Sequence, residues 1–131
     1  MFGLGKARCS VRLGGRYGSA GQAARASAAA MPRTPSGKIF GGCNVENATY
    51  GLTVCAERVA IFKAISEGEH QFDAIAVVTD TDTLTPPCGA CRQLIWEFCG
   101  DVPVVMSNLH GRVEELRMSQ LFPKPFDSSN L

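Results

Sequence analysis

The chain has 131 residues, of which 45% are apolar and 19% are charged. This length suits one domain rather than two, and the composition is typical of a globular protein. The formal net charge of +1 provides no strong positive potential for binding nucleic acid, and no apolar run approaches membrane-spanning length. We therefore expect the chain to bind neither nucleic acid nor a membrane.

Residues 1–36 differ in composition from the rest of the chain. No acidic residue precedes Glu46, and Gly, Ala, Ser and Arg dominate the segment. We expect residues 1–36 to form an atypical, flexible N-terminal segment and residues 37–131 to form the folded domain. Two alternatives are an organelle-targeting peptide and the product of an altered first exon or reading frame. Within this segment, the Ala-rich stretch 19–31 favours a helix by propensity.

The rest of the chain alternates between strand and helix patterns. The predicted elements are a strand at 39–45, a helix at 53–67 stopped by Gly68, a strand at 72–79, a helix at 88–98, strands at 102–106 and 113–116, and a helical turn at 118–122. This order predicts α/β layering with parallel neighbouring strands. The first of these helices is apolar almost all round, which suggests that it also faces another subunit.

Six cysteines is a high number for this length. Cys55 and the pair Cys88 and Cys91 fit one zinc site, because three thiolates leave one tetrahedral position open for water, as in catalytic zinc sites. No apolar signal-peptide core precedes them. We therefore expect reduced, metal-binding thiols in a cytoplasmic protein rather than a disulfide framework.

The residues around the cysteines fit a catalytic site better than a structural one. All three cysteines are predicted at helix N-termini, where free N–H groups and the helix dipole stabilise thiolates. Glu57 follows Cys55 by two positions, so it lies close to the metal and free to move protons, while Arg58 would offset the excess negative charge of three thiolates on Zn²⁺. A structural site would need a fourth ligand, and the candidates Cys43, Cys99, His70 and His110 lack the usual spacing.

Three stretches together resemble the cytidine deaminase family. They are Gly42-Cys43-Asn44-Val45-Glu46-Asn47-Ala48-Thr49-Tyr50-Gly51, then Cys55-Ala56-Glu57-Arg58, then Pro87-Cys88-Gly89-Ala90-Cys91-Arg92-Gln93. The likeness runs from about residue 34 to residue 126. It implies a three-layer α/β/α fold around a five-stranded mixed sheet, one Zn²⁺ per chain, and a homotetramer whose active sites combine several subunits.

The resemblance also implies the reaction and the roles of single residues. Cytidine or deoxycytidine would be hydrolysed to uridine or deoxyuridine plus ammonia, a step of pyrimidine salvage. Glu57 would carry a proton from the activated water to the pyrimidine N3 and help ammonia leave. The other assignments are Cys55, Cys88 and Cys91 to zinc, Asn44, Val45, Glu46 and Ala56 to substrate, with Asn44 and Glu46 on the ribose 3′-hydroxyl, and Ala48, Tyr50 and Phe126 to the pocket of a neighbouring subunit.

The N-terminal part departs from the family pattern. The family opens with a helix and then a strand that carries a base-stacking Phe, and nothing before Lys38 reproduces this; residues 28–31 resemble the end of that strand only faintly. We therefore expect the first helix and strand to be missing, which would expose a sheet edge and impair activity.

Other functions remain open at this point. Within the deaminase class, the chain would act on a related aminopyrimidine such as blasticidin S. Outside it, the chain would be a non-catalytic zinc-binding isoform that joins oligomers. An editing deaminase for nucleic acids is disfavoured, because the motif-bearing part has no basic stripe.

Overall fold

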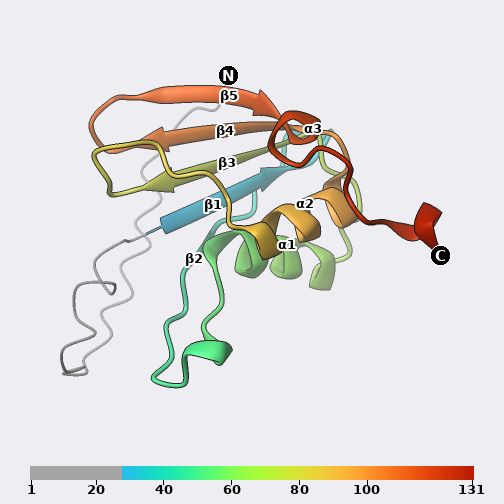
Figure 1. The fold of residues 1–131 in the computed structure, drawn as a ribbon, viewed down its shortest axis with the longest axis horizontal. Helices are drawn as coiled ribbons and strands as arrows, with labels where there is room; N and C mark the ends of the chain where they lie inside the picture. The colour runs from blue at the N-terminus through green and yellow to red at the C-terminus, as the bar shows by residue number, and fades with distance from the viewer. Residues whose placement is uncertain (1–27) are drawn as a thin grey trace.

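The computed structural model describes residues 28–131, which form one mixed five-stranded sheet with helices (Figure 1). The strand order is β2-β1-β3-β4-β5. The strands are β1 (Ala28–Arg33), β2 (Gly42–Cys43), β3 (Ala74–Thr79), β4 (Pro103–Asn108) and β5 (Val113–Arg117). β3 and β4 pair in parallel, and the other neighbouring strands pair antiparallel. The predicted α/β fold with a mixed sheet is confirmed.

Two longer helices, α1 (Ala56–Ser66) and α2 (Gly89–Cys99), lie side by side on one face of the sheet (Figure 1). A short helix α3 (Met118–Leu121) and the 3₁₀ turns η2 (Tyr50–Leu52) and η3 (Ser128–Asn130) complete the described elements. The second helical layer that the family resemblance implies is not found among residues 28–131. The expectation that the first helix is missing concerned residues 1–36, and of these residues 1–27 lie outside the described part of the chain. No helix of residues 28–131 is long and apolar enough to cross a membrane.

The main core lies between this helical layer and the centre of the sheet. Every second residue of β4 faces the helices, and α1 turns one face toward the strands, as the 3.6-residue period requires. The largest fully buried aliphatic side chains of this core are Ile61, Ile75, Ile95, Val104 and Met118. Truncating such a side chain to Ala usually costs about 2–5 kcal/mol of stability.

Both longer helices end at glycines in the left-handed region of backbone space. Gly68 follows α1 with φ +92°, and its N–H donates to the carbonyl of Ile65 at 2.9 Å. Gly100 follows α2 with φ +72°, and its N–H donates to the carbonyl of Trp96 at 3.0 Å. Only glycine adopts such a φ without strain from a Cβ. The predicted stop at Gly68 is confirmed.

The expectation of a missing first strand is wrong. β1 occupies the interior of the sheet and pairs with β3 from Ala28 opposite Thr79 to Arg33 opposite Ala74. Helix propensity predicted a different conformation for its Ala-rich residues, but tertiary packing prevails. The flexible segment expected over residues 1–36 therefore does not include Ala28–Arg33, and its part from 1 to 27 lies outside the described residues.

Specific contacts hold β1 in place. Ala30 is fully buried in one cluster with Ala56 and Ala60 of α1. At the other end of the strand, Arg33 makes a bidentate ion pair with Asp73, with N···O distances of 2.8 and 3.1 Å. Small residues thus provide the close approach, and the ion pair fixes the strand end.

The strand predicted over 39–45 is much shorter in the structure. β2 contains Gly42 and Cys43 alone, and Ile39 and Val45 make isolated bridges to Arg33 and Val54. The chain bends away after Cys43 into a long loop that projects from the sheet and carries η2 (Figure 1). The prediction placed this strand at the right position in the sequence but made it too long.

Gly42 is the tightest point between β2 and α1. A Cβ at Gly42 would lie 2.5 Å from the backbone nitrogen of Ala60 and 2.8 Å from the carbonyl oxygen of Ala56, whereas a Cβ at Gly41 would have nothing within 4 Å. We predict that Gly42→Ala lowers the free energy of unfolding by about 1–3 kcal/mol or more, since backbone atoms must move. Urea denaturation measures this. The matched control Gly41→Ala should stay close to the parent, and equal stability of both variants would contradict the prediction.

Candidate active site

The parallel pairing of β3 and β4 brings two helix N-termini together. The chain runs from the end of α1 to the start of β3, and from the end of β3 through a loop to the start of α2. Both helices therefore begin at the carboxyl edge of β3. This edge is where open α/β sheets usually bind ligands. Cys55 is the residue that precedes α1 as its N-cap, Cys88 is the N-cap of α2, and Cys91 lies in the first turn of α2. The cysteines lie at the two helix starts as predicted, although α1 begins at Ala56, three residues after the predicted start, and α2 begins at Gly89, one residue after it.

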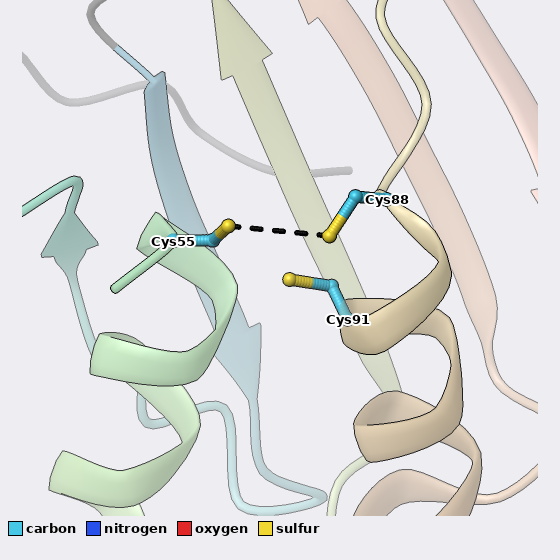
Figure 2. Close-up of side chains that lie close together, drawn as sticks. All are labelled: Cys55, Cys88 and Cys91. Atoms are coloured by element: carbon cyan, nitrogen blue, oxygen red, sulfur yellow. Dashed lines mark hydrogen bonds between the residues drawn. The ribbon is translucent and has the colours of Figure 1, made fainter. Parts of the chain in front are cut away.

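The three thiols form one cluster. Figure 2 shows the sulfurs of Cys55, Cys88 and Cys91 directed toward one another from the two helix starts. All three lie within 4.8 Å of one another, and the Sγ atoms of Cys55 and Cys88 are 4.0 Å apart. Two sulfurs bound to zinc at about 2.3 Å in a tetrahedral arrangement lie about 3.8 Å apart. The cluster therefore fits Zn²⁺ with little adjustment.

A structural zinc site would need a fourth protein ligand. Among residues 28–131, no further Cys, His, Asp or Glu joins the three thiols in a metal-sized group. Cys99 packs instead against the core at the far end of α2, where burial raises its pKa to about 12. The described residues thus provide three ligands, the number typical of a catalytic zinc site.

The environment of the thiols divides them by acidity. Burial raises the pKa of the Cys88 thiol, but hydrogen bonds from the backbone amide and side chain of Cys91 and from Cys55 outweigh it, so the net pKa is below the usual value. Burial and the neighbouring carboxylate of Glu57 raise the pKa of Cys91. A bound dication deprotonates its thiol ligands outright, so metal binding must displace protons here.

Glu57 lies beside the cluster in the first turn of α1 and is only 5% exposed. Burial raises the pKa of its carboxyl group, and hydrogen bonds from its own backbone amide and from Cys91, together with the charge of Arg58, oppose this shift. A raised pKa makes a carboxylate a stronger proton acceptor than an ordinary one, which suits a group that takes up and releases a proton during a reaction. Glu57 is therefore equipped for proton transfer at the thiol cluster.

Arg58 directs its guanidinium at the cluster. Its Nη2 donates to the carbonyl of Thr53 at 3.0 Å and lies 3.6 Å from the Sγ of Cys55. Its Nε is buried and has no hydrogen-bond partner within the described residues. A buried N–H without a partner normally costs free energy. Here the same side chain places a positive charge beside the sulfur of Cys55, which stabilises the thiolate form.

The loop after β2 joins the site through Asn44. The side-chain oxygen of Asn44 accepts from the backbone N–H of Ala56 at 3.1 Å, and its amide nitrogen lies 3.4 Å from a carboxylate oxygen of Glu46. Asn44 therefore caps α1 next to Cys55, a role that sequence analysis missed. It also holds an amide and a carboxylate together, a pair that can donate to and accept from one hydroxyl group. Val45 lies between them and is half exposed.

The residues expected to serve a neighbouring subunit lie at the surface of this chain. Tyr50 is 74% exposed on the projecting loop, Phe126 is 60% exposed near the C-terminus, and Ala48 is exposed as well. The backbone around Phe126 is nevertheless tied to α2, because Gln93 donates to its carbonyl at 2.8 Å and Trp96 donates to Asp127 at 3.0 Å.

The chain belongs to the cytidine and deoxycytidylate deaminase zinc-binding family, whose model matches residues 17–107. The match begins at residue 17, well before the position near 34 where the likeness was expected to start. That expectation was too narrow. The agreement between the family match and the three-thiol cluster assigns zinc as the cofactor of this chain.

Individual relatives agree with the family match. A cytidine deaminase of Sporosarcina psychrophila is 51% identical over 96 residues, which cover 72% of this chain and 71% of that protein. The 1.6 Å crystal structure of a cytidine deaminase from Burkholderia pseudomallei matches with a TM-score of 0.76 and 43% identity, over 79% of this chain and 84% of that chain. A blasticidin-S deaminase of Bacillus cereus is 32% identical over 99 residues, 70% of each protein.

The cluster geometry predicts the effect of removing one thiol. Cys88→Ala should lose zinc and also lose stability, because metal binding in such sites is coupled to folding. Zinc per chain, measured by elemental analysis on the purified protein, checks this. Cys99→Ala serves as the control and should retain zinc, since Cys99 lies outside the cluster. Full zinc occupancy in the Cys88 variant would exclude Cys88 as a ligand.

Proposed function

We propose that this chain is a zinc-dependent deaminase that hydrolyses cytidine and deoxycytidine to the uridine nucleosides and ammonia. The observation that carries the proposal is the buried carboxyl group of Glu57 beside three convergent thiols. The names of the relatives, which include cytidine deaminases that are 51% and 50% identical over 72% of this chain, support the substrate class. Such an enzyme belongs in pyrimidine salvage.

The roles of the chain's own residues follow from their positions. Cys55, Cys88 and Cys91 would hold Zn²⁺, which when bound lowers the pKa of water enough to provide a nucleophile near neutral pH. Glu57 would take up a proton there, deliver it to N3 of the pyrimidine ring and then assist the departure of ammonia. Arg58 would limit the negative charge that three thiolates accumulate, and so preserve the acidity of the metal centre.

The pair Asn44 and Glu46 supports a nucleoside substrate. Asn44 is anchored to the start of α1, so its distance from Cys55 and Glu57 is fixed by the helix itself. Its amide and the carboxylate of Glu46 would hold a ribose hydroxyl, with Val45 and Ala56 lining the same region. Holding the sugar orients the base relative to the reacting groups, and such orientation lowers the barrier of the chemical step.

Glu57→Gln tests the proton-transfer role. The amide keeps the size of the side chain but cannot carry a proton, so we predict that the variant retains zinc and loses roughly 10²- to 10⁴-fold in kcat. Ammonia release from cytidine and elemental analysis provide the two measurements. Glu97→Gln, at an exposed position of α2, is the matched control and should behave like the parent. A kcat within a few-fold of the parent would show that Glu57 is not the proton carrier.

A related aminopyrimidine is the second candidate substrate, favoured by the likeness to the blasticidin-S deaminase. Parallel assays with cytidine, deoxycytidine and blasticidin S decide between them through kcat/KM. Preference for either nucleoside supports the proposal. Zinc binding without ammonia release from any of the three would instead identify a non-catalytic zinc-binding protein.

We also infer that the chain works as a homotetramer in the cytoplasm. The exposed aromatic side chains Tyr50, Phe62, Phe98 and Phe126 support subunit contacts, because exposed apolar groups of this size favour association. Phe62 and Phe98 form an edge-to-face pair across the outer sides of α1 and α2, with ring centroids 6.4 Å apart. A site of free thiols supports a reducing compartment such as the cytoplasm.

The proposed role of Phe126 in a neighbouring pocket has a kinetic consequence. We predict a light-scattering mass of four chains for the parent, and an increase in KM of roughly twofold to tenfold for Phe126→Ala, as expected for the loss of one aromatic contact. Zinc content should not change. Leu109→Ala, which removes another exposed apolar side chain, should leave KM as it is. A single-chain mass together with a parental KM in the Phe126 variant would refute the shared pocket.

A further inference from the structure

Arg92 makes an unusual set of contacts beside the metal cluster. It follows Cys91 in the first turn of α2, and its Nε donates to the carbonyl of Pro87 at 2.8 Å. Its Nη1 donates to the carbonyl of Leu121 at 2.6 Å. Within residues 28–131 it forms no ion pair with a carboxylate, so both side-chain partners are backbone carbonyls. A guanidinium suits this task, because its rigid fork can reach two acceptors at once.

Arg92 thereby contacts both peptide groups that flank Cys88. Its side chain holds the carbonyl of Pro87, which belongs to the planar peptide unit leading into Cys88. Its backbone N–H donates to the carbonyl of Cys88 at 2.9 Å, on the other side of the same residue. Fixing both planes leaves the Cα–Cβ bond of Cys88 little freedom of direction.

Cys88 is the thiol that most needs such support. Cys91 is fully buried and Cys55 is partly buried, whereas Cys88 is exposed. Surrounding side chains therefore hold its sulfur less firmly than those of the other two, and the backbone must fix it. The third contact of Arg92 leads to Leu121, which lies in the same buried cluster as Met118, so the guanidinium is anchored to the core.

We propose that Arg92 is a positioning residue of the metal site, which holds the Pro87–Cys88 peptide so that the exposed thiol of Cys88 stays directed at the other two. The residue acts through the backbone, because its hydrogen bonds go to the carbonyls of Pro87, Cys88 and Leu121 and not to a sulfur. Its loss would loosen one ligand of three, and the metal would then dissociate more readily. Groups that support a metal ligand in this way typically change metal affinity 10- to 100-fold.

Zinc transfer to a chromogenic chelator tests the proposal without any substrate. The folded, zinc-loaded Arg92→Met variant should release zinc roughly 10- to 100-fold faster than the parent. Arg92→Lys can reach one carbonyl at a time and should be intermediate. Arg117→Met is the matched control, because Arg117 also binds a backbone carbonyl, that of Asp101, as well as its carboxylate. Asp101 lies beyond the opposite end of α2, which is about 16 Å long.

The control should lose stability and release zinc at the parental rate. Parental zinc release in folded Arg92→Met, or equal acceleration in Arg117→Met, would overturn the proposal, since either result means that Arg92 contributes only to general stability. If Arg92→Met does not fold, Arg92→Lys decides by the same rate comparison. The outcome is independent of the proposed deaminase reaction: accelerated zinc release in a chain that fails to deaminate cytidine would support Arg92 and refute that reaction alone.

Discussion

β3 and β4 run parallel from the pair Ile75–Val104 to the pair Thr79–Asn108. Parallel strands cannot be joined by a tight turn, and the connection must cross back along the sheet, which is what α2 does. The C-terminus of α1 leads to the start of β3, whereas α2 follows the end of β3. Both helices therefore begin at the same sheet edge. Thiols that are distant along the chain meet there, and the capping by Asn44 and the contacts of Arg92 refine an arrangement that the topology has already set.

The same geometry gathers much negative charge in a small volume. Three thiols and the carboxyl group of Glu57 share the site, where burial and the charge of Glu57 raise the pKa of Cys91, while hydrogen bonds lower the pKa of Cys88. Two helix N-termini and Arg58 supply positive potential. Protons and metal therefore compete for the same sulfurs, and metal affinity falls as the pH falls.

Sequence patterns predicted the local parts of this structure well. Short motifs mark the metal ligands Cys55, Cys88 and Cys91, and a glycine after an apolar helix pattern marks the stop at Gly68. Such signals lie within a few residues of one another, so they can be identified in the sequence. The strand β1 could not, because Ala-rich sequence favours helix and becomes a strand here only through packing against α1 and pairing with β3. Arg92 was visible as part of a motif, but its partner Leu121 is distant in the chain and nothing local indicated that contact.

The interior place of β1 has a consequence for how the protein is made. Ala28 must pair with Thr79, and a ribosome that adds roughly 5–20 residues per second needs a few seconds to synthesise the intervening chain. During that interval β1 has been translated without its main partner. Its residues, Ala-Ala-Ala-Met-Pro-Arg, have little apolar bulk, and they include a proline that cannot donate a ladder hydrogen bond. A segment of this kind can remain unpaired until Thr79 has been synthesised, with little tendency to pair with the wrong chain.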